Sequence, residues 1–157
     1  MATEIERKFT APADGPFTDV PAIPVEQGYL VRADGAHVRI RKSGSAHTLT
    51  VKKGRGLTRQ EFEIDISADD FDLLWPATEG ARVTKTRRLV PLSDGRTACV
   101  DEFAAQLAGL VMVEVEFTTE DEARRFRPPA WFGTEVTDDV RYSNSVLVTA
   151  GRPVTDR

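Results

Sequence analysis

Several features that mark other protein classes are scarce in this sequence. Cysteine occurs once, as Cys99, and histidine twice, so neither a disulfide framework nor a cysteine–histidine zinc site is expected. No apolar run is long enough for a transmembrane helix, and the first residues lack the basic and then apolar pattern of a secretory leader. No repeat or low-complexity tract interrupts the chain. These absences favour one cytoplasmic domain spanning residues 1–157.

An excess of positive charge is also missing. The chain carries 21 Lys and Arg against 25 Asp and Glu, a formal net charge of −4. Bulk attraction to nucleic acid is therefore not expected, and neither is a membrane partner. A bound metal would have to be held by carboxylates, which favours Mg²⁺, Mn²⁺ or Ca²⁺. The oligomeric state stays open, a homodimer included.

Most of the chain consists of short segments in which polar and apolar residues alternate. That period predicts β-strands, and Gly, Asp and Ser between the segments predict tight turns. The predicted strands are 4–9, 27–33, 37–43, 47–53, 59–66, 81–92, 96–103 and 109–117. A proline-rich loop is expected at 10–25, and helices at 67–77, 118–126 and 138–150. The predicted class is α+β, mainly β and mostly antiparallel.

Charged residues occupy one face of six of these strands. The first strand, E-I-E-R-K-F, places Glu4, Glu6 and Lys8 on one side and Ile5 and Phe9 on the other. A solvated sheet face is the ordinary explanation for one such strand, but it would mix Ser, Thr, Gln and Lys freely. Six faces of paired acids and bases instead favour a closed antiparallel barrel with a charged lumen.

Equal numbers of acids and bases would line that lumen. They are Glu4, Glu6, Glu61, Glu63, Glu114 and Glu116, and Lys8, Arg39, Arg41, Lys52, Lys85 and Arg87. Enclosed charges need partners. Internal salt bridges would supply them. A polyphosphate bound with a divalent cation would supply them too, because bases hold phosphate oxygens and carboxylates hold the metal.

The same residues carry a family resemblance. "EIERKF" resembles the Glu-x-Glu-x-Lys signature of the CYTH superfamily, the triphosphate tunnel metalloenzymes. "VRIR", "LTVKKG", "RQEFEI", "KTRR", "VDEF" and "GLVMVEVEF" follow in the order of the family's motifs, so the resemblance covers essentially the whole chain. Within the superfamily, the chain is similar to the short bacterial inorganic triphosphatases. The resemblance implies a closed eight-stranded antiparallel β-barrel, a tunnel with flanking helices, acting with Mg²⁺ or Mn²⁺.

The resemblance also implies roles for individual residues. Glu4, Glu6, Glu114 and Glu116 match the metal-binding acids, and the six bases match the triphosphate-binding set. Tyr29 and Lys85 match a catalytic pair linked to tripolyphosphate hydrolysis, and Glu61 or Glu63 would orient the attacking water. Asp101 and Arg141 are further candidates. His37 is interpreted as a loop residue, and Cys99 as a small buried hydrophobe rather than a nucleophile.

The implied activity is metal-dependent hydrolysis of inorganic tripolyphosphate by in-line attack of water, releasing phosphate and pyrophosphate. Three alternatives share the same tunnel. A class IV adenylyl cyclase would convert ATP to cyclic AMP and needs a nucleoside pocket. A thiamine triphosphatase needs an aromatic platform at the mouth. A non-catalytic sensor would bind triphosphate without turnover.

Overall fold

Alternation of polar and apolar residues produces eight strands in a computed structural model that describes residues 2–154. The strands are β1 (Ala2–Thr10), β2 (Ile23–Ala33), β3 (Ala36–Ser43), β4 (Ala46–Lys53), β5 (Thr58–Asp65), β6 (Arg82–Pro91), β7 (Thr97–Phe103) and β8 (Val111–Phe117). All eight predicted strands are confirmed. The start of β2 was predicted too late, because Pro24 was assigned to the loop. Proline is tolerated close to the first residue of a strand, and Pro24 there lies opposite Thr86 of β6.

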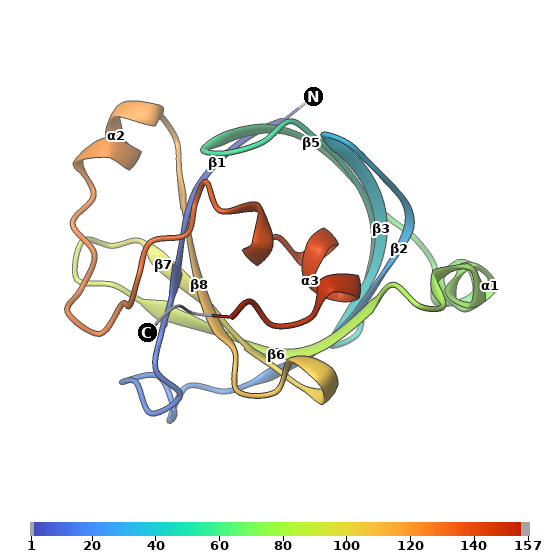
Figure 1. The fold of residues 1–157 in the computed structure, drawn as a ribbon, viewed down its shortest axis with the longest axis horizontal. Coiled ribbons are helices and arrows are strands. Elements are labelled where there is room, and N and C mark those ends of the chain that lie inside the picture. The colour runs from blue at the N-terminus through green and yellow to red at the C-terminus, as the bar shows by residue number, and fades with distance from the viewer. Residues whose placement is uncertain (1, 155–157) are drawn as a thin grey trace.

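The strands close on themselves in the order β1-β5-β4-β3-β2-β6-β7-β8 (Figure 1). Every neighbouring pair is antiparallel, and β8 returns to β1 along the register Glu6 to Glu116. Closure leaves no unpaired strand edge among these eight and divides each strand into an inner and an outer face. The predicted mainly-β α+β fold with a closed eight-stranded barrel is confirmed.

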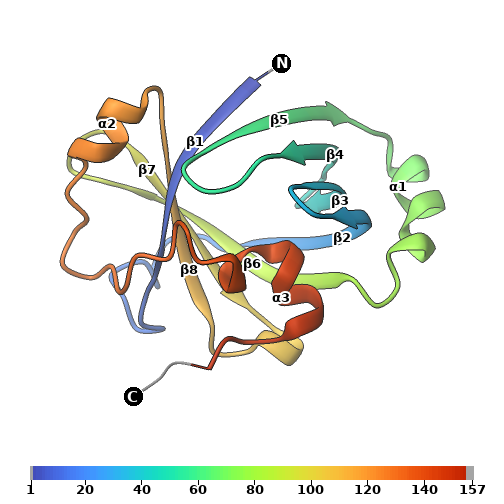
Figure 2. The ribbon, with the colours of Figure 1, turned by 45° about the horizontal axis from the view of Figure 1, so that its top comes forward.

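In the described part of the chain, three short α-helices and three 3₁₀ turns flank the barrel (Figure 2). Ser67 caps α1 (Ala68–Leu74) and Thr119 caps α2 (Glu120–Arg125), each by accepting a hydrogen bond from a backbone N–H of the first turn. The 3₁₀ turns are η1 (Trp75–Thr78), η2 (Ala105–Leu107) and η3 (Val140–Tyr142). Within the described residues, no helix has the length and apolarity to cross a bilayer.

The last predicted helix, 138–150, is divided in two. The 3₁₀ turn η3 is followed by α3 (Asn144–Ala150), and Ser143 between them has extended backbone, with φ −71° and ψ 140°. Ser143 therefore ends one helical segment and caps the next. The break lets the C-terminal segment change direction across the end of the barrel, where Figure 1 shows α3 lying within the outline of the ring.

Two apolar cores lie on opposite sides of the barrel wall. The outer core packs Phe9, Val113 and Val115 against Phe126 and Phe132, outside the strands and beneath α2. The inner core lies within the barrel, where inward side chains of the wall meet the C-terminal segment. Its members include Tyr29, Val83, Phe103 and Met112 of the wall, and Tyr142, Leu147 and Val148 of η3 and α3.

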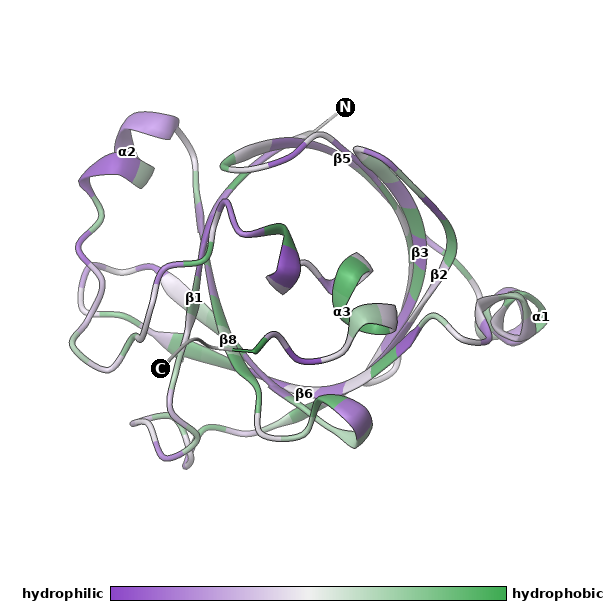
Figure 3. Ribbon diagram, in the orientation of Figure 1, coloured by the Kyte–Doolittle hydropathy of each residue, from purple (hydrophilic) through white to green (hydrophobic). Residues whose placement is uncertain are grey.

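The inner core was not predicted from the sequence. The inner faces of the strands were expected to be charged, but at one end of the lumen they are apolar and are covered by α3, which is coloured largely as hydrophobic in Figure 3. Only part of the barrel interior is thus available to a charged ligand.

Replacing Phe9 by alanine should lower the free energy of unfolding by about 3–5 kcal/mol, because a fully buried ring is removed from the outer core. The Phe9 ring centroid lies 4.9 Å from that of Phe132. Urea unfolding followed by circular dichroism would measure the change. Leu73→Ala, at a side chain that is 78% exposed, should change it by less than about 0.5 kcal/mol. Equal effects of the two substitutions would contradict this description of the core.

Candidate active site

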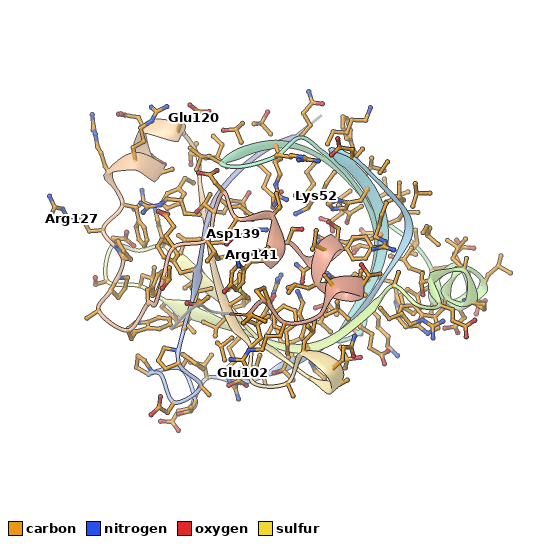
Figure 4. All side chains as sticks on the ribbon, viewed as in Figure 1. Lys52, Glu102, Glu120, Arg127, Asp139 and Arg141 are labelled. Atoms are coloured by element: carbon orange, nitrogen blue, oxygen red, sulfur yellow. The ribbon has the colours of Figure 1, made fainter. Side chains whose placement is uncertain are left out.

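Charged side chains of the inner faces meet in a cavity of about 560 Å³ within the barrel. Eleven of the twelve predicted lumen acids and bases line it: Glu4, Glu6, Lys8, Arg39, Arg41, Lys52, Glu61, Glu63, Arg87, Glu114 and Glu116. Tyr29 lines it as well. Figure 4 shows Lys52 inside the ring of strands, whereas Glu120 and Arg127 lie outside it. The alternation of residues along the strands is therefore sufficient to assign most of the lining.

The register of the strands decides which charges become neighbours. Residues directly opposite one another in an antiparallel pair project to the same face. In the β1–β8 pair this places Lys8 opposite Glu114 and Glu6 opposite Glu116. Lys52 of β4 lies opposite Glu61 of β5. Two of these pairs join opposite charges and the third joins two acids.

The acids differ accordingly in their ionisation. Burial favours the neutral form of Glu114, but Lys8, Arg87 and Lys85 outweigh burial and hold its pKa well below the ordinary value. Burial and the nearby Glu114 raise the pKa of Glu6. Burial, Glu4 and Glu6 together raise the pKa of Glu116. Three acids on one wall, Glu4, Glu6 and Glu116, thus repel one another.

Glu4, Glu6 and Glu116 have the chemistry of a divalent-cation site. Carboxylate oxygens are the ligands that Mg²⁺ and Mn²⁺ prefer, and buried Glu4 Oε2 accepts no hydrogen bond from any described residue. In residues 2–154 no three acidic, cysteine or histidine side chains already converge as a metal cage. Bases hold the oxygens instead: Lys52 Nζ lies 3.0 Å from Glu4 Oε2, and Lys8 Nζ lies 3.5 Å from Glu6 Oε1.

Two arginines of β3 are enclosed without an acidic partner. Arg39 is 5% exposed, and its Nε makes no hydrogen bond. Arg41 donates a hydrogen bond to the neutral side chain of Gln27, at 3.0 Å. Within the described part of the chain neither guanidinium forms a salt bridge. Burial, Arg39 and Arg87 lower the pKa of Arg41 to about 10. The cavity therefore holds positive charge that the protein itself does not neutralise.

Lys85 is held deeper than the other bases. Its ammonium is fully buried, 2.7 Å from Asp101 Oδ2, and lies over the ring of Phe103. Asp101 also accepts two hydrogen bonds from Arg87, at 2.7 and 2.9 Å. Burial lowers the pKa of Lys85 to about 7, although Asp101 opposes the shift. Lys85 lies opposite Val25 in β2, four residues before Tyr29. The expected Tyr29–Lys85 pair is thus not in hydrogen-bond contact among the described residues, and its catalytic role stays a prediction.

Comparison with known proteins identifies the chain. No protein-family profile matches it. An inorganic triphosphatase of Nitrosomonas europaea is 49% identical over 92% of this chain and 96% of its own length. An inorganic triphosphatase of Acetivibrio thermocellus is 35% identical over 94% of each chain. The chain belongs to the CYTH superfamily, among its short bacterial inorganic triphosphatases. A crystal structure described as an inorganic triphosphatase is 47% identical with a TM-score of 0.69, covering 94% of this chain and 95% of that chain.

Sequence reasoning missed two charged residues that line the cavity of this CYTH barrel, Arg59 and Arg96. Arg59 lines the cavity and forms ion pairs with Glu6 and, at 3.6 Å, with Glu4. Its position was available in the sequence, because Arg59 continues the alternation of Glu61 and Glu63 within the quoted "RQEFEI". Only the acids of this strand, Glu61 and Glu63, were assigned to the lumen, and Arg59 at its beginning was left out.

Two residues were assigned to the wrong surroundings. His37 is a wall residue of β3, not a loop residue: it lines the cavity and packs edge-on against Tyr29, with centroids 5.2 Å apart. Burial, Arg39 and Lys52 lower the pKa of His37 to about 3. Cys99 is half-buried and also lines the cavity, so it is not a buried hydrophobe of the core.

Arg141 pairs with Asp139 in the C-terminal segment, outside the set that lines the cavity.

Replacing Asp101 by asparagine should lower the free energy of unfolding by about 3–5 kcal/mol, because Lys85 and Arg87 would then face each other, buried, without a counter-charge. Thermal and urea unfolding would measure the loss. Asp94→Asn removes an Asp–Arg pair near the surface and should cost less than about 1 kcal/mol. A loss from Asp101→Asn no larger than that control would show that Asp101 does not compensate the two bases.

Proposed function

We propose that this protein hydrolyses inorganic tripolyphosphate to phosphate and pyrophosphate in a reaction that depends on Mg²⁺ or Mn²⁺. The observation that carries the proposal is a pair of arginines that line the cavity and form no salt bridge with a described acid: Arg39, which is buried, and Arg41, which is partly buried. An enclosed, uncompensated guanidinium is unfavourable unless an anion binds to it. Two of them beside Lys8, Lys52 and Arg87 fit a polyanion rather than a single carboxylate.

The bases would position the substrate and neutralise its charge. Phosphoryl transfer depends mainly on alignment and on stabilisation of the phosphate oxygens, and little on covalent chemistry by the protein. Arg39 and Arg41 lie in register with Tyr29 and Gln27 of β2, so both guanidiniums project from the same wall of the lumen. Asp101 fixes Arg87 from behind through two hydrogen bonds, which limits the orientations of that guanidinium.

The acids would divide between two tasks. Glu4, Glu6 and Glu116 would hold the divalent cation, which when bound supplies charge to the phosphate oxygens and acidifies water. Glu61 and Glu63 lie on the neighbouring strand β5 and would orient the attacking water. Glu63 accepts a hydrogen bond from the Thr50 hydroxyl at 3.1 Å, which fixes that carboxylate at the cavity wall. The free cysteine is consistent with action in a reducing cytoplasm.

Phosphate release from tripolyphosphate, ATP, thiamine triphosphate and pyrophosphate, each with Mg²⁺, Mn²⁺ or EDTA, tests the proposal. We expect fast metal-dependent release from tripolyphosphate, little release from ATP and none in EDTA. Cyclic AMP formed in the ATP reaction would replace the proposal by a cyclase. Preference for thiamine triphosphate would indicate a thiamine triphosphatase. Tight binding of tripolyphosphate without release would indicate a sensor.

Replacing Arg39 by glutamine should reduce kcat/KM for tripolyphosphate about 10- to 100-fold, the size expected for a lost charge-assisted phosphate contact. The melting temperature should not fall, because the substitution also removes an enclosed charge that has no partner. Steady-state kinetics and thermal unfolding measure the two quantities. Lys42→Gln removes a positive charge from an exposed position of the same strand and should leave both unchanged. Equal kinetic losses in the two variants would show that Arg39 contributes only to the overall positive charge and makes no specific contact with the phosphate.

A further inference from the structure

Arg59 occupies carboxylate oxygens that the proposed function assigns to the metal. It lies at the start of β5, directly opposite Glu4 in the β1–β5 register. Its guanidinium Nη2 is in ion-pair contact with Glu6 Oε1 and lies 3.6 Å from Glu4 Oε2. The Arg59 side chain is 10% exposed, and its Nε makes no hydrogen bond. Arg59 therefore forms an enclosed bridge between the two acids of the Glu-x-Glu-x-Lys motif.

This bridge has a clear electrostatic cause. Glu6 lies opposite Glu116 across the β1–β8 pair, and Glu4 lies on the same wall. Three carboxylates this close favour a cation among them. Burial opposes the charge on Arg59, but Glu6, Glu4 and Glu114 outweigh burial and raise its pKa. Lys52 pairs with Glu4 and Lys8 with Glu6, whereas the Arg59 guanidinium contacts both acids at once.

A metal and Arg59 would compete for the same oxygens. A guanidinium binds a carboxylate through the lone pairs that also coordinate a metal ion. Coordination of a metal by Glu6 Oε1 would therefore displace Arg59 from that oxygen, and coordination by Glu4 Oε2 would weaken its second contact. A withdrawn guanidinium would lie among Lys8, Arg39 and Lys52, and two acids of the same cavity already have basic partners: Glu61 lies 3.8 Å from Lys52 Nζ, and Glu114 lies 3.9 Å from Lys8 Nζ.

The position of Arg59 limits where a withdrawn guanidinium can go. It lines both the main cavity and a second cavity of about 780 Å³ that extends to the β2–β3 and β4–β5 turns. Lys8 and His37 also line both cavities, so Arg59 lies at the junction between the two. A triphosphate held by Arg39 and Lys8 would place phosphate oxygens within reach of this junction, and those oxygens would be the new partner for the guanidinium.

We propose that Arg59 is an exchangeable counter-ion, which neutralises Glu4 and Glu6 while no metal is bound and transfers to the triphosphate when metal and substrate enter together. The inference rests on the proposed function. It makes the two ligands mutually dependent: metal alone must displace Arg59 from its contacts with Glu4 and Glu6, whereas triphosphate provides new phosphate partners for it. Each ligand should therefore strengthen the binding of the other by the same factor.

Isothermal titration with Mn²⁺, with and without a non-hydrolysable imido analogue of triphosphate, tests the exchange without relying on turnover. The Arg59→Gln variant should bind Mn²⁺ alone about tenfold more tightly than wild type, because the competing cation is gone. The analogue should strengthen Mn²⁺ binding to wild type about 5- to 100-fold, and distinctly less in Arg59→Gln. Lys53→Gln removes one positive charge from an exposed position of neighbouring β4 and should bind Mn²⁺ within about twofold of wild type.

The outcomes separate this inference from the proposed function. Mn²⁺ binding to Arg59→Gln that is unchanged or weaker, in a variant with wild-type circular dichroism, overturns the exchange. The Arg59→Lys variant controls for misfolding. It keeps the competing positive charge, so it should bind Mn²⁺ weakly, as wild type does. Equal tightening in Lys53→Gln also overturns the exchange, because bulk charge would then explain it. If wild type hydrolyses tripolyphosphate in any of these cases, only the exchange fails. If wild type neither binds Mn²⁺ nor hydrolyses tripolyphosphate, both fail.

Discussion

Charge enclosed in the barrel must be balanced, and this requirement governs the rest of the structure. Acids and bases are removed from water together, so each needs a neighbour of opposite sign within the lumen. Asp101 balances Lys85 and Arg87, and Arg59 bridges Glu4 and Glu6. Among the bases of the lumen, Arg39 and Arg41 form no salt bridge with any described acid. The imbalance is local, and it lies where the cavity is open to a ligand.

Closure of the sheet turns the alternation of charged and apolar residues along each strand into this set of facing charges. In an open sheet the charged face would be solvated, and the bases would have little reason to remain in pairs with acids. Because β8 pairs with β1, every second residue of each strand faces a shared interior. The register then sets the neighbours, which is why Glu114, opposite Lys8, is strongly acidic while Glu116, opposite Glu6, is not.

Residues whose surroundings depend on one strand were predictable from the sequence. Alternation placed Glu4, Glu6 and Lys8 in the lumen, as it did most of the charged lining. His37 was placed wrongly because its neighbour Tyr29 comes from another strand, and the bulge after Tyr29 in the β2–β3 pair shifts the register there. The position of α3, whose apolar residues close one end of the lumen as a plug, was missed for a similar reason. Its apolar residues resemble those of any amphipathic helix, and only the three-dimensional structure brings Leu147 and Phe103 into one apolar core inside the barrel.

The apolar plug and the charged cavity occupy the same interior, and each explains a property of the other. Phe103 belongs to the inner core and lies against the Lys85 ammonium, so the plug keeps water away from that end of the charged set. Exclusion of water strengthens the attraction of Lys85 to Asp101 and also lowers the pKa of Lys85. Charges near the plug are thus fixed by protein partners, whereas Arg39 and Arg41 are not. Stability then comes from the two apolar cores, the inner one at the plug and the outer one around Phe9 on the other side of the wall. The open part of the lumen can therefore keep charges that disfavour folding but are suited to binding a polyanion.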